Sequence, residues 1–268
     1  MNKRFWSKVG YLWILGLVFF ALRLVQLRVG FDPATGLAIP TLWGSVLAHY
    51  AAVCAIGQFL VCFFTAPRVR TDFAGAFDPP VKSVPVMAAG GMLLAAGGVL
   101  LLLSALPVRG VAAMAAGVLA VAAGGGFVLL TRQIRRGDAL TVFPLLPAMF
   151  FSVFFVLAVY LPEESDPVLS RFYIPVLAAA MAAAAFSLLA AFLRQEGNLR
   201  TFTFVGNLSV MFCLAAAADG VGGDWAKAPL FLGCALVLSV FLFLSREHPV
   251  PLPEEEKPDP KAPAAEEA

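Results

Sequence analysis

Residues 23–40, RLVQLRVGFDPATGLAIP, carry the end of one apolar segment, a sharp turn and the start of the next segment. The turn begins at Asp32-Pro33, a pair that favours an ordered reverse turn. Arg23 stands inside the first segment, because the uncharged run 9–22 is too short to cross the ~30 Å hydrocarbon core of a bilayer by itself. The stretch therefore predicts a transmembrane hairpin with a cation in its first helix.

The composition of the whole chain indicates a membrane protein. Of the 268 residues, 60% are hydrophobic and 13% are charged, which is far from the balance of a soluble domain. The apolar residues come in long blocks, not in the spaced stripe of an amphipathic surface helix. The slight excess of basic residues is explained by membrane orientation, so we expect no nucleic-acid partner. The sequence predicts an all-α, polytopic transmembrane bundle in contact with the lipid bilayer.

Eight segments are apolar and long enough, at ~20 residues, to cross a bilayer as helices. The last two of them are the shortest. We place the eight segments at residues 9–27, 41–64, 83–105, 110–131, 142–161, 173–193, 202–218 and 229–244, within a transmembrane domain covering 1–245. The remaining residues, 246–268, are acidic and rich in proline, and we predict a disordered cytoplasmic tail.

Lysine and arginine are concentrated on one side of these segments, which predicts their orientation. With the N-terminus inside, the outer side holds only Arg28, Arg109, Arg171 and Lys227. The inner side holds Lys3, Arg4, Lys8, Arg68, Arg70, Lys82, Arg132, Arg135, Arg136, Arg194, Arg200 and Arg246. We therefore predict that both termini face the cytoplasm. The general character of the chain favours a cell membrane, that of a bacterium.

Segments 83–105 and 110–131 are rich in small residues and are joined by a very short link. Small residues at four-residue spacing allow helix backbones to approach closely, so we predict a tight antiparallel pair. The residues concerned are Gly90, Gly91, Gly97 and Gly98 in one segment and Ala112, Ala116, Ala120 and Gly124 in the other. A break of the helix at Gly124-Gly125-Gly126 is the alternative. Similar small-residue faces are candidates for contact with a membrane-protein partner or a second copy.

Matching dipeptides are consistent with an internal repeat of four plus four parallel segments. They precede the second and sixth segments, and the third and seventh. The matches are Asp32-Pro33 with Asp166-Pro167, Ile39-Pro40 with Ile174-Pro175, and Arg70-Thr71 with Arg200-Thr201.

Arg23 is the first candidate functional residue, because placing a cation within a span costs a few kcal/mol. The favoured interpretation is snorkelling, in which the guanidinium reaches the headgroups while its stem stays in lipid. The alternative is that Arg23 faces the bundle and meets partners. Gln26 lies one turn along, His49 lies at comparable depth in the second segment, and Asp32 is a candidate counter-ion. These four residues form the candidate ligand-binding site, facing outward.

Other polar residues are assigned structural roles. Gln58 and Asn207 stand in the inner half of the membrane, where amide side chains commonly bond across helices. Asp219 and Asp224 share the glycine-rich sequence DGVGGD, and we interpret them as part of a solvated turn. Cysteines fall within apolar runs without metal-ligand spacing, and motifs for zinc or nucleotide binding are absent from the sequence. We therefore predict no metal, no cofactor and no catalytic residue.

The function predicted from these features is that of a non-enzymatic multi-pass membrane protein, acting as a membrane partner, an assembly subunit or a small-ligand binder. One alternative is a facilitative or anion-recognising permease with an outward-facing polar site at Arg23 and His49. A second alternative is an intramembrane lipid-modifying enzyme, which requires Arg23, His49 and Asp32 to act together.

Overall fold

The computed structural model of the chain describes residues 3–32, 34, 37–39, 42–66, 70–71, 77, 84–107, 110–136, 144–163, 173–194, 196–221 and 225–247. This part of the chain folds as an all-α bundle, as predicted. Its helices are α1 Lys3–Val29, α2 Leu42–Thr65, α4 Val84–Ala105, α5 Val111–Arg136, α6 Leu145–Glu163, α7 Tyr173–Ala191, α8 Leu199–Val221 and α9 Lys227–Glu247. A 3₁₀ turn, η3, covers Phe192–Arg194, and two short strands, β1 (Arg70–Thr71) and β2 (Gly197–Asn198), pair antiparallel.

Seven of these helices are long and apolar enough to cross a membrane, and the apolar stretch described in α6, Leu145–Ala158, is shorter. Large apolar side chains remain exposed along outward faces, among them Leu42, Val53 and Phe64 of α2. Exposed apolar surface on this scale is stable where lipid is the solvent. The helices are therefore those of a multi-pass membrane protein.

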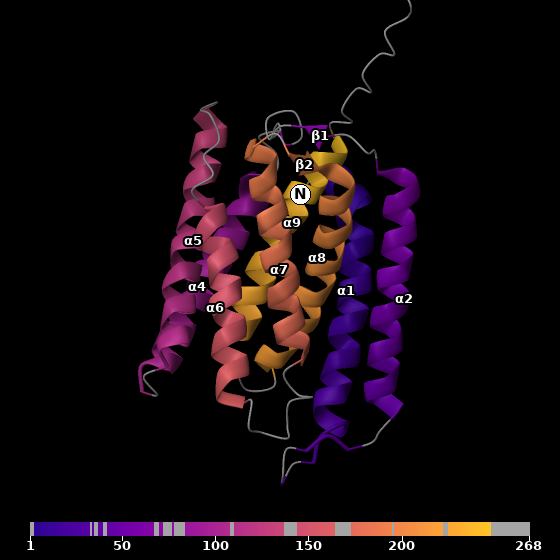
Figure 1. Ribbon diagram of the computed structural model, residues 1–268, viewed down its shortest axis with the longest axis vertical. Helices are drawn as coiled ribbons and strands as arrows, with labels where there is room; N and C mark the ends of the chain where they lie inside the picture. Colours follow the sequence, from indigo (N-terminus) through magenta and orange to yellow (C-terminus); the bar gives the residue numbers. More distant parts are fainter. Residues whose placement is uncertain are drawn as a thin grey trace, which may run out of the picture.

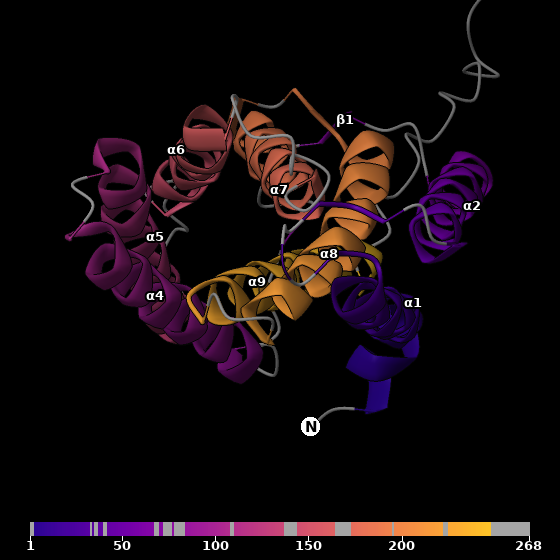
Figure 2. The same cartoon turned by 90° about the horizontal axis from the view of Figure 1, so that it is seen from below.

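The helices run roughly side by side, with the α1–α2 connection at one end of the bundle and β1 and β2 at the other (Figure 1). Seen along the bundle, α4, α5, α6 and α7 lie on one side of α8 and α9, and α1 and α2 lie on the other side of α8 (Figure 2). Helix α8 packs against α1, α2, α7 and α9, while α9 also packs against α4. The two segments predicted to be the shortest are thus the centre of the bundle, and both helices extend beyond the predicted ranges.

Small residues bring α4 close to α5, as their spacing predicts, and also close to α9, a contact that was not predicted. A Cβ atom added at Gly98 of α4 meets the Gly117 carbonyl oxygen of α5 at 2.8 Å. A Cβ atom added at Gly97, on the adjacent face, meets the backbone nitrogen of Leu230 in α9 at 2.6 Å. The backbones therefore lie too close for larger side chains at these positions. Helix α5 continues through Gly124, so the alternative of a helix break there is wrong.

The packing does not show the two-fold relation that a four-plus-four repeat implies. In such a repeat α4 and α8 are counterparts and occupy equivalent places. In the most apolar stretch of α8, however, 83% of the residues are buried, whereas in that of α4 the share is 33%. One helix lies at the centre and the other at the edge, so the described packing does not support the repeat.

The predicted turn after α1 is present. The backbone N–H of Asp32 donates to the carbonyl of Leu37 at 2.9 Å, and that of Ile39 donates to Gly30 at 2.9 Å. At the opposite end of the bundle Phe77 is fully buried and packs edge-on against Phe192 of η3, Phe202 of α8 and Phe241 of α9. The predicted tail beyond Glu247 and the residue Asp224 lie outside the described residues.

Candidate functional site

Arg23 lies inside the bundle, where α1, α7 and α8 meet. Its side chain is fully buried, and its guanidinium donates to both carboxylate oxygens of Asp219, from Nη2 at 2.7 Å and from Nε at 3.2 Å. Nη1 donates to Oε1 of Gln26, one turn along α1, at 2.7 Å. The guanidinium carbon also lies 5.5 Å from the ring centre of Tyr173 on α7. The cation is thus neutralised by a bidentate ion pair, the strong form of charge-assisted hydrogen bonding.

Two predictions about this region are wrong. Arg23 does not snorkel, because its charge is satisfied by a carboxylate within the protein and not by headgroups. Asp219 is not part of a solvated turn. It lies in the last turn of α8 and is 8% exposed, since the helix continues to Val221. A charge in an apolar medium requires a nearby opposite charge, and α8 supplies that charge to α1.

His49 does not join this cluster. Its side chain is exposed on α2, and its Nδ1 lies 2.7 Å from the carbonyl oxygen of Ser45 on the same helix. Asp32 is half-buried, and its Oδ1 accepts the backbone N–H of Ala34 at 2.9 Å. Its carboxylate caps the turn, while the ion pair of Arg23 is with Asp219. Of the four residues predicted to form the outer site, the structure brings Arg23 and Gln26 together by hydrogen bonding.

A second polar network lies toward the opposite end of the bundle, which we call the inner half after the predicted orientation. Nδ2 of Asn207 on α8 donates to Oε1 of Gln58 on α2 at 2.8 Å. The same nitrogen lies 3.3 Å from the hydroxyl oxygen of Tyr11 on α1. These three residues join α1, α2 and α8, in agreement with the prediction that Gln58 and Asn207 bond across helices.

Arg246, in the last turn of α9, completes this inner network. Its Nη2 donates to the Tyr11 hydroxyl oxygen at 2.9 Å and to Oδ1 of Asn207 at 3.1 Å. Nη1 donates to the backbone carbonyl of Lys8, whose Nζ donates back to the Arg246 carbonyl at 2.8 Å. The guanidinium also lies 5.3 Å from the ring centre of Tyr11. All of its described partners are neutral groups.

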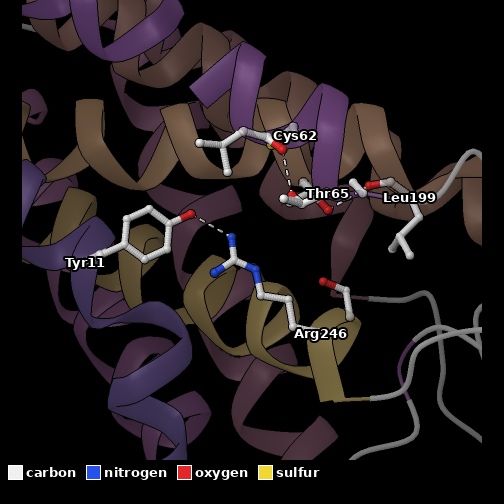
Figure 3. Close-up of a pocket in the computed structure, with 9 residues that line it drawn as sticks. Tyr11, Cys62, Thr65, Leu199 and Arg246 are labelled. Carbon is white, nitrogen blue, oxygen red and sulfur yellow. Dashed lines mark hydrogen bonds between the residues drawn. The ribbon is translucent and has the colours of Figure 1, made fainter. Parts of the chain in front are cut away.

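A pocket of about 400 Å³ opens beside this network, between α1, α2, α8 and α9 (Figure 3). Tyr11, Cys62 and Arg246 belong both to the network and to the pocket wall. The remaining lining is largely apolar or consists of small hydroxyl side chains, namely Val61, Thr65, Ala66, Leu199, Thr203 and Ser245. In Figure 3 the Tyr11 ring and the Arg246 guanidinium face each other across one side of the pocket, with α2 opposite.

Three basic residues of the described chain, Arg246, Arg200 and Lys8, lie in or beside the pocket wall. Arg200 of α8 donates from Nε to the carbonyl of Ala66, a pocket-lining residue, at 2.9 Å, and its guanidinium lies 5.1 Å from the Phe63 ring centre. Lys8 bonds to the backbone of Arg246 from the other side. Among the described residues, no carboxylate forms an ion pair with any of these three cations, in contrast to Arg23, which is paired with Asp219.

A smaller pocket, of about 270 Å³, lies toward the opposite end of α1 and α2, which we call the outer end after the predicted orientation, beside Gln26, Gly44 and Tyr173. The region between the two pockets is filled. Phe19 is fully buried there and packs edge-on against Tyr50 of α2 and Phe212 of α8, at ring-centre distances of 5.6 and 5.2 Å. The two pockets are therefore separate in this structure.

Sequence reasoning missed Tyr11, Tyr173, Asp219 and Arg246 as members of polar clusters. One signal for the inner network was available, because Tyr11, Gln58 and Asn207 each stand about two helical turns from the inner end of their helices. Polar residues at equal depth in neighbouring spans are candidates for mutual bonding. In the sequence, Arg246 is one of the basic residues that predict the orientation, and nothing there indicates its hydrogen bonds to Tyr11 and Asn207.

The described residues contain no group of three His, Cys, Asp or Glu side chains placed to hold a metal ion. The four cysteines are buried thiols. Comparison of the chain with models of protein families, with curated proteins and with solved structures finds no match.

Proposed function

We propose that this protein is a non-enzymatic, multi-pass membrane protein that binds a small ligand in the inner pocket. The observation that supports this function most directly is Arg246, whose guanidinium borders a 400 Å³ pocket and is not paired with any described carboxylate. A pocket of this size, mostly apolar and with a few convergent polar groups, has the character of a small-molecule site.

The outer cluster supports a structural role instead. Arg23 has a bidentate counter-ion, and its third described hydrogen bond goes to Gln26. An anionic ligand at this place has to compete with Asp219 for the same guanidinium. The lipid-modifying alternative needs Arg23 and His49 in one cluster, and His49 lies on an exposed face of α2.

A screen of thermal unfolding tests the proposed site. The purified protein is heated in the presence of a panel of small metabolites and lipids, alongside the variant Thr65→Trp, in which an indole at the exposed pocket rim fills the cavity. We expect compounds that raise the unfolding temperature of the wild type to lose their effect in this variant. Leu42→Trp is the control, because it places the same side chain at the other, exposed end of α2.

A facilitative permease is the second candidate, and the outer pocket is the observation that favours it. The two pockets lie at opposite ends of the contact between α1 and α2, separated by Phe19 and its aromatic neighbours. A passage along this contact requires α2 to move away from Phe19. Uptake into liposomes of a compound identified by the screen distinguishes the two functions, since a binder gives no protein-dependent flux.

A further inference from the structure

We propose that the ligand of the inner pocket is an anionic amphiphile, with a phosphate or carboxylate held by Arg246 and an apolar chain lying against α2. This inference rests on the proposed function, because it names the chemical class of ligand for the same pocket.

The first argument is charge. Arg246 borders the pocket, Lys8 is bonded to the backbone of Arg246, and Arg200 is bonded to the backbone of Ala66 in the pocket wall. Among the described residues, none of the three cations has a carboxylate partner. Attraction between charges is strong where water is scarce, and an anion entering this pocket meets Arg246 and lies near two further cations that have no described carboxylate partner.

The second argument is hydrogen-bonding capacity. A guanidinium has five N–H donors, and the described partners of Arg246 use one on Nη1 and two on Nη2. Nε and the second N–H of Nη1 have no partner among the described residues. Each of these two N–H groups can donate to one oxygen of a phosphate or a carboxylate, and such a bond is strengthened by the opposite charges of donor and acceptor.

The hydroxyl groups of the pocket do not provide an alternative set of donors. Thr65 donates to the carbonyl of Val61 at 2.6 Å, and Thr203 donates to that of Leu199 at 2.8 Å. Ser245 likewise donates to Leu242 at 2.9 Å. Their protons are directed to their own helices, and the Tyr11 hydroxyl donates to Oε1 of Gln58 at 3.5 Å. The donors left for a ligand are therefore those of the cations. This arrangement selects for an acceptor that carries negative charge.

The third argument is the apolar part of the wall. Val61, Cys62, Ala66 and Leu199 line the pocket, and Val61 and Thr65 of its rim are exposed on α2. In a membrane, α2 presents this rim to lipid. An acyl chain can therefore lie along α2 while its head enters between α2 and α9, without taking the apolar portion into water.

The test compares lipids that differ in charge. The full chain is reconstituted in phosphatidylcholine nanodiscs containing either phosphatidylglycerol or diacylglycerol. A third sample, in pure phosphatidylcholine, receives inorganic phosphate. We expect phosphatidylglycerol to raise the unfolding temperature and to be retained in native mass spectrometry. Arg246→Gln should weaken its apparent affinity about tenfold or more, because a charge-assisted hydrogen bond is lost.

Arg132→Gln is the matched control. It removes one exposed basic residue near the C-terminal end of α5, a helix that does not line the pocket. Arg200→Gln provides a second pocket variant with the same expected direction, should Arg246→Gln fold poorly. If Arg132→Gln loses as much affinity for phosphatidylglycerol as Arg246→Gln does, the loss is caused by general surface charge and the inference is overturned.

Three further results separate the inference from the proposed function. If diacylglycerol protects as well as phosphatidylglycerol and Thr65→Trp abolishes both effects, the pocket binds lipid but the anionic class is wrong. If inorganic phosphate protects as well as the lipid, the amphiphile is wrong. If Thr65→Trp leaves every effect unchanged, the proposed function itself fails.

Discussion

The guanidinium of Arg23 has its charge satisfied inside the bundle, whereas that of Arg246 borders a pocket. Both arginines bond to a polar side chain of α1 and to α8, and both lie over a tyrosine ring. The difference is one carboxylate. Asp219 makes Arg23 a structural link between α1 and α8, while the described partners of Arg246 leave its positive charge uncompensated. The same residue type therefore has different partners at the two ends of the bundle.

A double-mutant cycle tests the structural role of Arg23. We expect Arg23→Met or Asp219→Leu alone to lower the free energy of unfolding by about 3–5 kcal/mol, because each leaves a buried charge without its partner. The double variant should be much more stable than the sum of the two losses predicts, since it removes both charges. Unfolding in detergent micelles measures all four proteins.

His49→Leu is the control for this cycle. The imidazole is exposed on α2, so its replacement should change the free energy of unfolding by no more than about 0.5 kcal/mol. Strictly additive effects of Arg23→Met and Asp219→Leu would contradict the ion pair as a link between the helices.

At the scale of the elements, helix α4 is held by backbone contact and not by large side chains. Its adjacent glycines face two different neighbours, with Gly91 and Gly98 against α5 and Gly90 and Gly97 against α9. Lipid gives no hydrophobic drive between helices, so close packing and dispersion hold them together. Glycine is required where two backbones meet, and this requirement can be separated from its effect on helix propensity.

Two neighbouring glycines of α5 distinguish the requirement for close backbone contact from the effect of glycine on helix propensity. A Cβ atom at Gly124 meets the backbone nitrogen of Ala95 at 2.6 Å and also contacts the carbonyl oxygen of Gly91, whereas a Cβ atom at Gly125 meets nothing within 4 Å. We expect Gly124→Ala to destabilise the protein by about 1–3 kcal/mol through overpacking. Gly125→Ala should be neutral or stabilising by up to about 1 kcal/mol, because alanine favours a helix.

Thermal unfolding of the two alanine variants, measured side by side in the same detergent, checks this expectation. Equal behaviour of the two proteins would show that α4 and α5 are not in backbone contact at Gly124.

For the whole molecule, the ends of α1 and α9 lie together, since Lys8 and Arg246 exchange hydrogen bonds through their backbone carbonyls. Both termini of the described chain are therefore at the same end of the bundle, the end that holds the larger pocket. The excess of basic residues at this end predicts that it faces the cytoplasm. The orientation decides which leaflet supplies a lipid ligand, so it bears directly on the function.

Cysteine labelling in intact cells tests the orientation. Ala34 and Glu196 are exposed residues at opposite ends of the bundle, and the native cysteines are buried, which limits background labelling. A membrane-impermeant maleimide should label Ala34→Cys in intact cells and Glu196→Cys only after the membrane is opened. The reverse pattern would place the inner pocket on the outer side.

Sequence alone determined the class of the protein, the eight helices of the described residues, the turn at Asp32 and the close pairing of α4 with α5. These features depend on local composition, on segment length relative to bilayer thickness and on the spacing of small residues. All three can be read directly from the sequence. Only the tertiary structure decided which polar groups meet. Arg23 and Asp219 are 196 residues apart, and His49, at comparable depth, faces away from them. The physical reason is that these helices are apolar on nearly every side, so hydropathy does not specify their rotation. Which face of each helix turns inward, and hence which charge is neutralised and which borders a pocket, follows from packing around α8 and α9.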